Sequence, residues 1–115
     1  MKDNRIDSLK RLQQIEGAII AIQNYVAHET KESFCVNDLL HDAVLFQFTV
    51  IGEAIIHIDN DKLDKYDYPW YKVRSFRNLI AHEYFNIKLI AVWQIIENDL
   101  PELNELVIKI LANEF

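Results

Sequence analysis

The sequence predicts an all-α fold, an antiparallel bundle of about five helices. The chain has 115 residues, half of them hydrophobic and 26% charged, which suits a single domain over residues 1–115. Only two glycines and two prolines are present, too few for the many turns of a β-sandwich or barrel. Apolar residues instead recur at spacings of three and four, the period of amphipathic helices.

The first two helices follow from this periodicity. The apolar stripe of a first helix over residues 5–25 consists of Ile6, Leu9, Leu12, Ile15, Ile19, Ile22 and Tyr25. A polar stretch at 28–33 interrupts the pattern, and Asn37 or Asp38 is placed to cap a second helix that runs to about residue 58. The second helix is apolar on more than one side. We therefore expect it to be central or to form a homodimer interface.

The remaining helices are predicted from loop and capping residues. Residues 59–68 form the most polar segment and predict a loop, and the proline that follows favours a helix over 69–81. Asn86 is a candidate cap for a fourth helix. Asp99 is a candidate cap for the last helix, which carries a proline near its first turn and a stripe of leucine, isoleucine and valine.

Charge, hydropathy and cysteine content exclude several classes of protein. A net charge of −6 and a pI near 5.1 disfavour coating of nucleic acid by bulk electrostatics. The longest apolar stretch, 43–58, is interrupted by polar residues and falls short of the roughly 20 residues that span a bilayer. The N-terminal residues lack the apolar core of a secretory signal. We expect a cytoplasmic protein with no membrane segment. Cys35 stands alone, and neither a metal site nor a cofactor is predicted.

One segment reverses the acidic average. Residues 62–77 hold two acidic and five basic residues, the latter being Lys62, Lys65, Lys72, Arg74 and Arg77. An anion site is expected there, with Lys72 and Arg74 as candidate RNA contacts, and a solvated surface is the alternative. The apolar residues of the helix over 69–81 share one face. We therefore expect its basic side chains to point largely away from the core.

Functional side chains concentrate where the third helix is predicted to end. Arg77 and His82 lie five residues apart, with Asn78 between them. In a continuous helix this spacing separates two side chains by about 140°, so we expect the helix to end near His82 and let both reach one phosphate. The alternatives are an arginine in a salt bridge and a histidine that caps the helix. Asn78 either supports this pair or makes a capping hydrogen bond.

An arginine and a histidine suit RNA cleavage without a metal. The 2′-hydroxyl must lose a proton while negative charge builds on phosphorus, and arginine stabilises that charge. One histidine does not easily serve as both base and acid, so a twofold dimer would supply the second. Glu53 and His57 lie four residues apart on the second helix and either form a buried polar pair or face the active-site cleft.

The string Arg77, four residues, His82, one residue, Tyr84 resembles the R-x4-H-x-Y signature of the HepT-like toxins, a branch of the HEPN superfamily. Nearly the whole chain shares this resemblance, through IGEAI at 51–55, PW at 69–70, RNLIAHEYF at 77–85, VW at 92–93 and DLPEL at 99–103. Ser75 and Phe76 stand where relatives often have Gly-Met, and Lys88 where an acidic residue is frequent. These departures leave substrate choice and partner contacts open.

The resemblance implies a dimeric HEPN ribonuclease, the toxin of a type VII-like HepT/MntA toxin–antitoxin pair that cleaves RNA such as tRNA or mRNA. Arg77 and His82 would be catalytic, and an MntA-type minimal nucleotidyltransferase antitoxin would transfer AMP from ATP to Tyr84. The added group would fill the groove and repel an RNA phosphate. One alternative is a non-catalytic HEPN module that binds nucleotide or RNA or docks a nucleotidyltransferase. The other is a structural dimer that needs neither residue.

Overall fold

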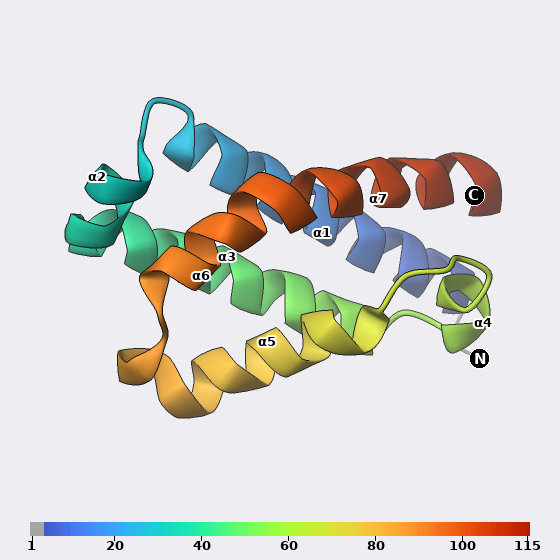
Figure 1. Ribbon diagram of the computed structural model, residues 1–115. Helices are drawn as coiled ribbons and strands as arrows, with labels where there is room; N and C mark the ends of the chain where they lie inside the picture. The colour runs from blue at the N-terminus through green and yellow to red at the C-terminus, as the bar shows by residue number, and fades with distance from the viewer. Residues whose placement is uncertain (1–3) are drawn as a thin grey trace.

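The computed structural model describes residues 4–115 and shows a helical bundle, with no β-strand in that range. Its long helices are α1 (Asn4–Val26), α3 (Asp38–Ile56), α5 (Trp70–Glu83) and α7 (Leu100–Glu114), and successive long helices run in opposite directions (Figure 1). α3 packs against α1 on one side and α5 on the other, and α1 also contacts α7. The predicted all-α antiparallel bundle is confirmed.

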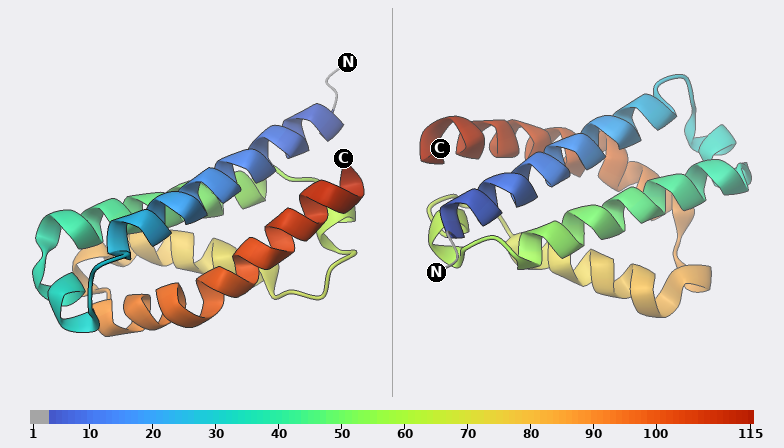
Figure 2. Two further views of the ribbon diagram at one scale, coloured as in Figure 1. Left: turned by 90° about the horizontal axis from the view of Figure 1, so that it is seen from above. Right: turned by 180° about the vertical axis from the view of Figure 1, so that it is seen from behind.

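Short elements occupy the two ends of the bundle. α2 (Lys31–Val36) and α6 (Leu89–Gln94) contact each other at one end, whereas α4 (Asn60–Leu63) lies at the other, beside the start of α1 and the end of α7 (Figure 2). The predicted break after the first helix therefore contains a short helix. Thr30 explains it, because its hydroxyl accepts a hydrogen bond from the Ser33 amide at 3.1 Å in a capping box.

The core is built from α1, α3 and α7, although Ile6 and Tyr25 of the predicted first stripe are exposed. Its fully buried large side chains include Leu12, Ile15, Ile19, Ile22, Leu45, Ile51, Ile55, Leu100 and Ile110. Asn37 caps α3, as one of the two predicted candidates, because its Oδ1 accepts a hydrogen bond from the Leu40 amide at 3.1 Å. α3 is the central helix of the bundle, which agrees with one of the two expectations drawn from its apolar surface.

α3 also bears on the predicted absence of a membrane segment. It has 19 residues and a mean hydropathy of 1.5, long and apolar enough by length and composition to cross a membrane. The apolar stretch used in the sequence analysis began later than the helix does, which is why it fell short. The core helix of a soluble bundle passes the same test, and α3 has neighbours on both sides.

The polar segment before α5 is fastened to the rest of the bundle. Trp70 donates a hydrogen bond from Nε1 to the Leu63 carbonyl at 3.0 Å and is buried. Lys65 Nζ and the Tyr66 hydroxyl both donate to the carboxylate of Glu114 at the end of α7, at 2.8 and 3.0 Å. The hydrogen bond from Lys65 lowers the pKa of Glu114. These contacts fix where α5 begins.

The predicted fourth and fifth helices form one nearly continuous rod. A π-helical turn, Ile95–Asp99, joins α6 to α7. Neither predicted cap is used: Lys88 stands at the N-cap of α6, Asn86 donates instead to Glu83 at 3.0 Å, and Asp99 makes no capping hydrogen bond. The physical reason at Asp99 is that a helix continuing from the previous turn already supplies carbonyl acceptors to the amides a cap would serve.

Candidate functional site

α5 ends within two residues of the predicted end, but it still includes His82. It continues through His82 to Glu83 and passes directly into a 3₁₀ turn, Tyr84–Asn86. Arg77 and His82 therefore lie on one regular helix, about 140° apart. His82 is exposed, whereas the Arg77 side chain is only 30% exposed. Within one copy of the chain, the local backbone does not turn the two side chains toward a common point.

Arg77 faces α3 and pairs with Glu53. Its guanidinium donates a hydrogen bond to the Glu53 carboxylate, which is 41% exposed. Gly52 makes this approach possible, because a Cβ at that position would overlap the Cβ of Arg77 and lie 2.8 Å from its Cγ. The expectation that Arg77 points away from the core is wrong, since the glycine leaves space for its aliphatic stem against α3.

Asn78 lies between Arg77 and the exposed side of α5. Its Oδ1 accepts a hydrogen bond from Arg77 Nη1 at 3.2 Å. Asn78 and His82 are four residues apart and share a side of the helix. The Nε of Arg77 is inaccessible to solvent and donates no hydrogen bond. The guanidinium is thus held by Glu53 and Asn78 and still has an unused donor.

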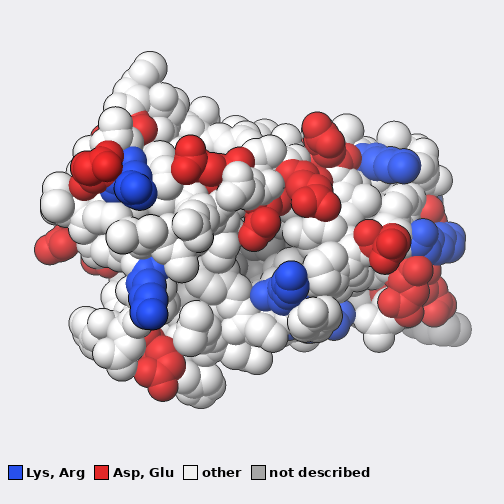
Figure 3. Space-filling model, viewed as in Figure 1, with Lys and Arg blue, Asp and Glu red and all other residues white. Residues whose placement is uncertain are grey.

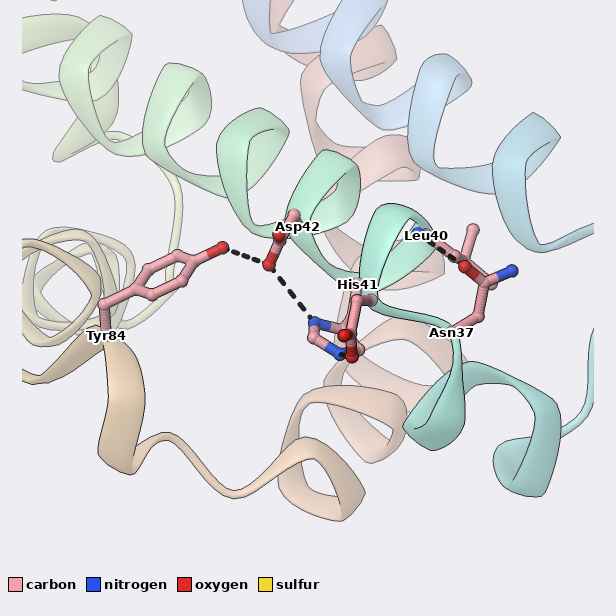
Figure 4. Close-up of polar contacts among 6 residues, drawn as sticks. Asn37, Leu40, His41, Asp42 and Tyr84 are labelled. Atoms are coloured by element: carbon pink, nitrogen blue, oxygen red, sulfur yellow. Dashed lines mark hydrogen bonds and ion pairs between the residues drawn. The ribbon is translucent and has the colours of Figure 1, made fainter.

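Tyr84 makes a second contact between α5 and α3. It follows Arg77 by seven residues, two helical turns, and its hydroxyl donates a hydrogen bond to the Asp42 carboxylate (Figure 4). Burial of the phenol, then the hydrogen bond to Asp42 and its charge, raise the pKa of Tyr84 to about 12. Tyr84 remains 36% exposed.

The contact extends to His41. Its Nδ1 lies 3.4 Å from Asp42 Oδ1, and its Nε2 lies 3.1 Å from Asp38 Oδ1 (Figure 4). The sequence analysis overlooked Asp42 and His41. Asp42 and Glu53 are eleven residues apart, three turns of helix, so this spacing was a signal that both carboxylates share one side of α3.

The basic residues at 62–77 do not gather into one site. Lys65 pairs with Glu114, Arg74 Nη2 lies 3.4 Å from Asn60 Oδ1, and Lys62 lies over the ring of Phe115. Lys72 lines a separate cavity of about 260 Å³ between α3, α5 and α7. On the face shown in Figure 3, basic side chains are scattered and form no continuous patch. Binding of RNA would therefore depend on a few placed residues.

Exposed apolar side chains surround the two contacts between α3 and α5. Leu39 and Phe46 lie on the same side of α3 as Asp42 and are 85% and 63% exposed. Phe85 is 96% exposed, and its ring meets that of Tyr84 edge-on at 5.5 Å between centroids. We call this surface the α3–α5 face, formed by Leu39, Asp42, Phe46, Glu53, Arg77, Tyr84 and Phe85. Apolar exposure of this kind marks interaction surfaces.

His57 takes no part in these contacts. It stands at the C-cap of α3 and is exposed, whereas Glu53 pairs with Arg77. Among residues 4–115, no group of three histidine, cysteine, aspartate or glutamate side chains is placed to hold a metal ion.

A protein-family model matches most of the chain. The family model described as ribonuclease HepT-like matches residues 15–110, a stretch that includes Glu53, Arg77, His82 and Tyr84. The chain belongs to the HepT-like family. The resemblance inferred from the R-x4-H-x-Y string is thereby confirmed, and the HepT-like family name describes ribonucleases.

Curated relatives in the HepT-like family carry ribonuclease names. A Methanocaldococcus jannaschii protein named "Putative RNase MJ1380" is 33% identical over 76% of this chain and 84% of its own length. A Thermococcus cleftensis protein named "Probable ribonuclease HepT" is 29% identical over 80% of this chain and 84% of its own.

A longer relative, "Gamma-glutamylcyclotransferase and putative RNase MJ0434" of M. jannaschii, is 31% identical over 87% of this chain, which spans 46% of that protein. No solved structure matches the chain.

Proposed function

We propose that this HepT-like protein is a metal-independent endoribonuclease that acts in the cytoplasm as the toxin of a toxin–antitoxin pair. Arg77 and His82 carry the cleavage, and Asn78 holds Arg77. The observation that supports this most is the placement of Arg77: its guanidinium lies between α3 and α5, is fixed by Glu53 and Asn78, and the side chain remains 30% exposed.

The reaction follows from these two side chains. His82 removes the proton from a ribose 2′-hydroxyl, and the resulting oxygen attacks the adjacent phosphorus. Arg77 stabilises the negative charge that builds on the phosphoryl oxygens, with donors arranged as a planar fork. The bond to the 5′-oxygen breaks, and that oxygen takes a proton from a second imidazole. The products are a 2′,3′-cyclic phosphate and a 5′-hydroxyl.

A homodimer would supply the second imidazole. Arg77 and His82 point to different sides of α5. One copy of the chain therefore does not bring both side chains to the same phosphate. The exposed Leu39, Phe46 and Phe85 on the α3–α5 face offer an apolar surface for a second copy. We propose that two copies pair through this face and bring their active residues into one groove.

The antitoxin would act on Tyr84. We propose that a minimal nucleotidyltransferase of the MntA type transfers AMP to its hydroxyl, which silences the nuclease. Tyr84 is 36% exposed and lies two turns from Arg77 on the same side of α5. An adenylate there adds negative charge and bulk near Arg77, which opposes binding of an RNA phosphate.

The ion pair with Glu53 favours one alternative, a non-catalytic module that binds RNA or the nucleotidyltransferase without cutting. Glu53 neutralises the charge that Arg77 would offer to phosphorus. Under this reading the Arg77–Glu53 pair is structural. Replacement of His82 should lower RNA cleavage if the protein is a nuclease, whereas a non-catalytic module has no cleavage to lose.

Cleavage assays separate the two functions. Purified protein should cut RNA in the presence of EDTA and leave 2′,3′-cyclic phosphate ends. Arg77→Ala and His82→Ala should each lower the cleavage rate by roughly 10²–10³-fold, the usual scale for losing an electrostatic or general acid–base group. His57→Ala is the matched control, because His57 is also exposed but lies outside the α3–α5 face. RNA binding without cleavage in the unaltered protein would establish the module instead.

A further inference from the structure

Tyr84 is held by a group that accepts its proton. The hydroxyl donates a hydrogen bond to Asp42 from a different helix, forty-two positions earlier in the chain. Because the pKa of Tyr84 is raised to about 12, its phenol stays protonated near neutral pH. Any transfer of a phosphoryl-type group to this oxygen therefore needs a base within hydrogen-bond reach, and Asp42 is in that place.

We propose that Asp42 is the catalytic base for nucleotidyl transfer to Tyr84, and that His41 is the positioning residue that holds the Asp42 carboxylate. This inference rests on the modification of Tyr84 proposed above and names a group of the toxin, the acceptor protein, as part of the transfer machinery. The antitoxin would then supply the nucleotide and its binding site, while its target supplies the base.

The step balances with a nucleoside triphosphate as co-reactant. The Tyr84 oxygen attacks the α-phosphorus and forms the new P–O bond, while the bond from that phosphorus to the bridging oxygen of the β-phosphate breaks. Pyrophosphate leaves with the bonding electrons. The phenolic proton passes to the Asp42 carboxylate and from there to water, which regenerates the base.

His41 is placed to fix the base. Its ring is 15% exposed and meets Phe34 edge-on, at 6.2 Å between centroids. One nitrogen lies 3.4 Å from Asp42 and the other 3.1 Å from Asp38, so the imidazole stands between two carboxylates of the same helix. Packing on one side and charge on both sides limit the conformations of His41. Asp61 is exposed and lies on α4, at the opposite end of the bundle (Figure 1), which makes it a suitable control.

The negative charge of Asp42 also has an effect that opposes its role as a base. A carboxylate beside the reacting oxygen repels the incoming triphosphate, and if repulsion dominated, removing the charge would speed the transfer. A base and a repelling charge therefore predict changes of opposite sign on Asp42→Asn. The substitution keeps the size of the side chain.

The test measures transfer of AMP by a minimal nucleotidyltransferase of the MntA type with Mg-ATP, by intact mass and peptide mapping of Tyr84. Asp42→Asn should slow modification by about 10²-fold or more, and Asp42→Glu should recover part of the rate. Asp61→Asn should stay within a few-fold of the unaltered protein. Melting temperatures of all three variants check that the fold is kept.

Each outcome decides the proposal. Modification of Asp42→Asn at the original rate, or faster, overturns the role of Asp42 while Tyr84 remains the acceptor. A slow Asp42→Asn with no recovery in Asp42→Glu, at unchanged melting temperature, overturns the base role, because a carboxylate placed near the hydroxyl then fails to restore the transfer. If the unaltered protein gains no AMP from a nucleotidyltransferase that does hydrolyse ATP, the proposed modification fails and the base proposal falls with it.

Discussion

The two contacts between α3 and α5 join the same helices through different surroundings. Arg77 and Glu53 meet in the middle of the pair, where the backbones approach closely over Gly52. Tyr84 and Asp42 meet at the end, where α5 passes into a 3₁₀ turn and Phe85 is 96% exposed. The first contact is built into helix packing, whereas the second lies beside the exposed Phe85. The closely packed position suits the proposed catalytic role of Arg77, and the end of the helix suits the proposed modification of Tyr84.

Gly52→Ala should have the largest effect, because it attacks the rigid contact directly. The new Cβ would overlap Arg77 and push α5 away from α3, at a cost of roughly 1–3 kcal/mol in the free energy of unfolding, typical of overpacking. Thermal denaturation measures it. Gly17→Ala is the matched control, because nothing lies within 4 Å of a Cβ there, and it should stabilise the exposed face of α1 by about 0.5–1 kcal/mol. Equal effects at the two glycines would contradict the close approach.

Glu53→Gln should act on catalysis more than on stability. The pair is partly exposed, so its loss should change the free energy of unfolding by no more than about 1 kcal/mol. Arg77 would lose its anchor on α3, and we expect RNA cleavage to fall by about tenfold. Cleavage assays and melting temperatures measured on the same sample distinguish the two effects. Faster cleavage would mean that Glu53 restrains Arg77 instead of positioning it.

Much of the bundle could be predicted because helical periodicity is local. The stripes of α1 and α7 and the Asn37 cap follow from residues within a turn of each other. The junction between α6 and α7 could not be predicted, because it depends on tertiary packing that favours continuing a helix over capping it. The π-helical turn at 95–99 leaves no pattern that single-sequence reasoning separates from an α-helix.

The site was predicted unevenly for the same reason. The candidate residues Arg77, Asn78, His82 and Tyr84 were singled out because they are neighbours in the sequence. Glu53 was also a candidate, but neither its pairing with Arg77 nor the role of Asp42 was predicted, because such contacts require the register of two antiparallel helices. Arg77 was misdirected because a pattern of apolar residues cannot show that Gly52 opens space for a charged one.

Titration of Tyr84 should measure the strength of its contact with Asp42 at the end of α5. Its pKa of about 12 in the folded state lies above the ordinary value of 10, so the folded state binds the proton more tightly. Its contribution to stability is complete below pH 10 and is lost as the pH rises toward 12. Ultraviolet difference titration against Tyr84→Phe should show this phenol, and Asp42→Asn should lower its pKa. An unchanged pKa would mean that Asp42 does not hold the hydroxyl.

Phe85→Ser should have the smallest effect on folding. The ring is almost fully exposed, so the free energy of unfolding should change by less than about 0.5 kcal/mol. If two copies pair through the α3–α5 face, the same change should shift sedimentation equilibrium toward the monomer. A dimer of unchanged affinity would move the interface away from this face.

The start of α1 and the end of α7 lie at the same end of a bundle 47 Å long, and the 3₁₀ turn Tyr84–Asn86 lies near the other end (Figure 2). This arrangement makes the unit modular. A second domain joined at either terminus by a short linker would leave the turn around Tyr84 accessible to the proposed modifying enzyme. A fluorescent label attached at either terminus would do the same. A fusion or a label at either end should therefore leave the α3–α5 face uncovered.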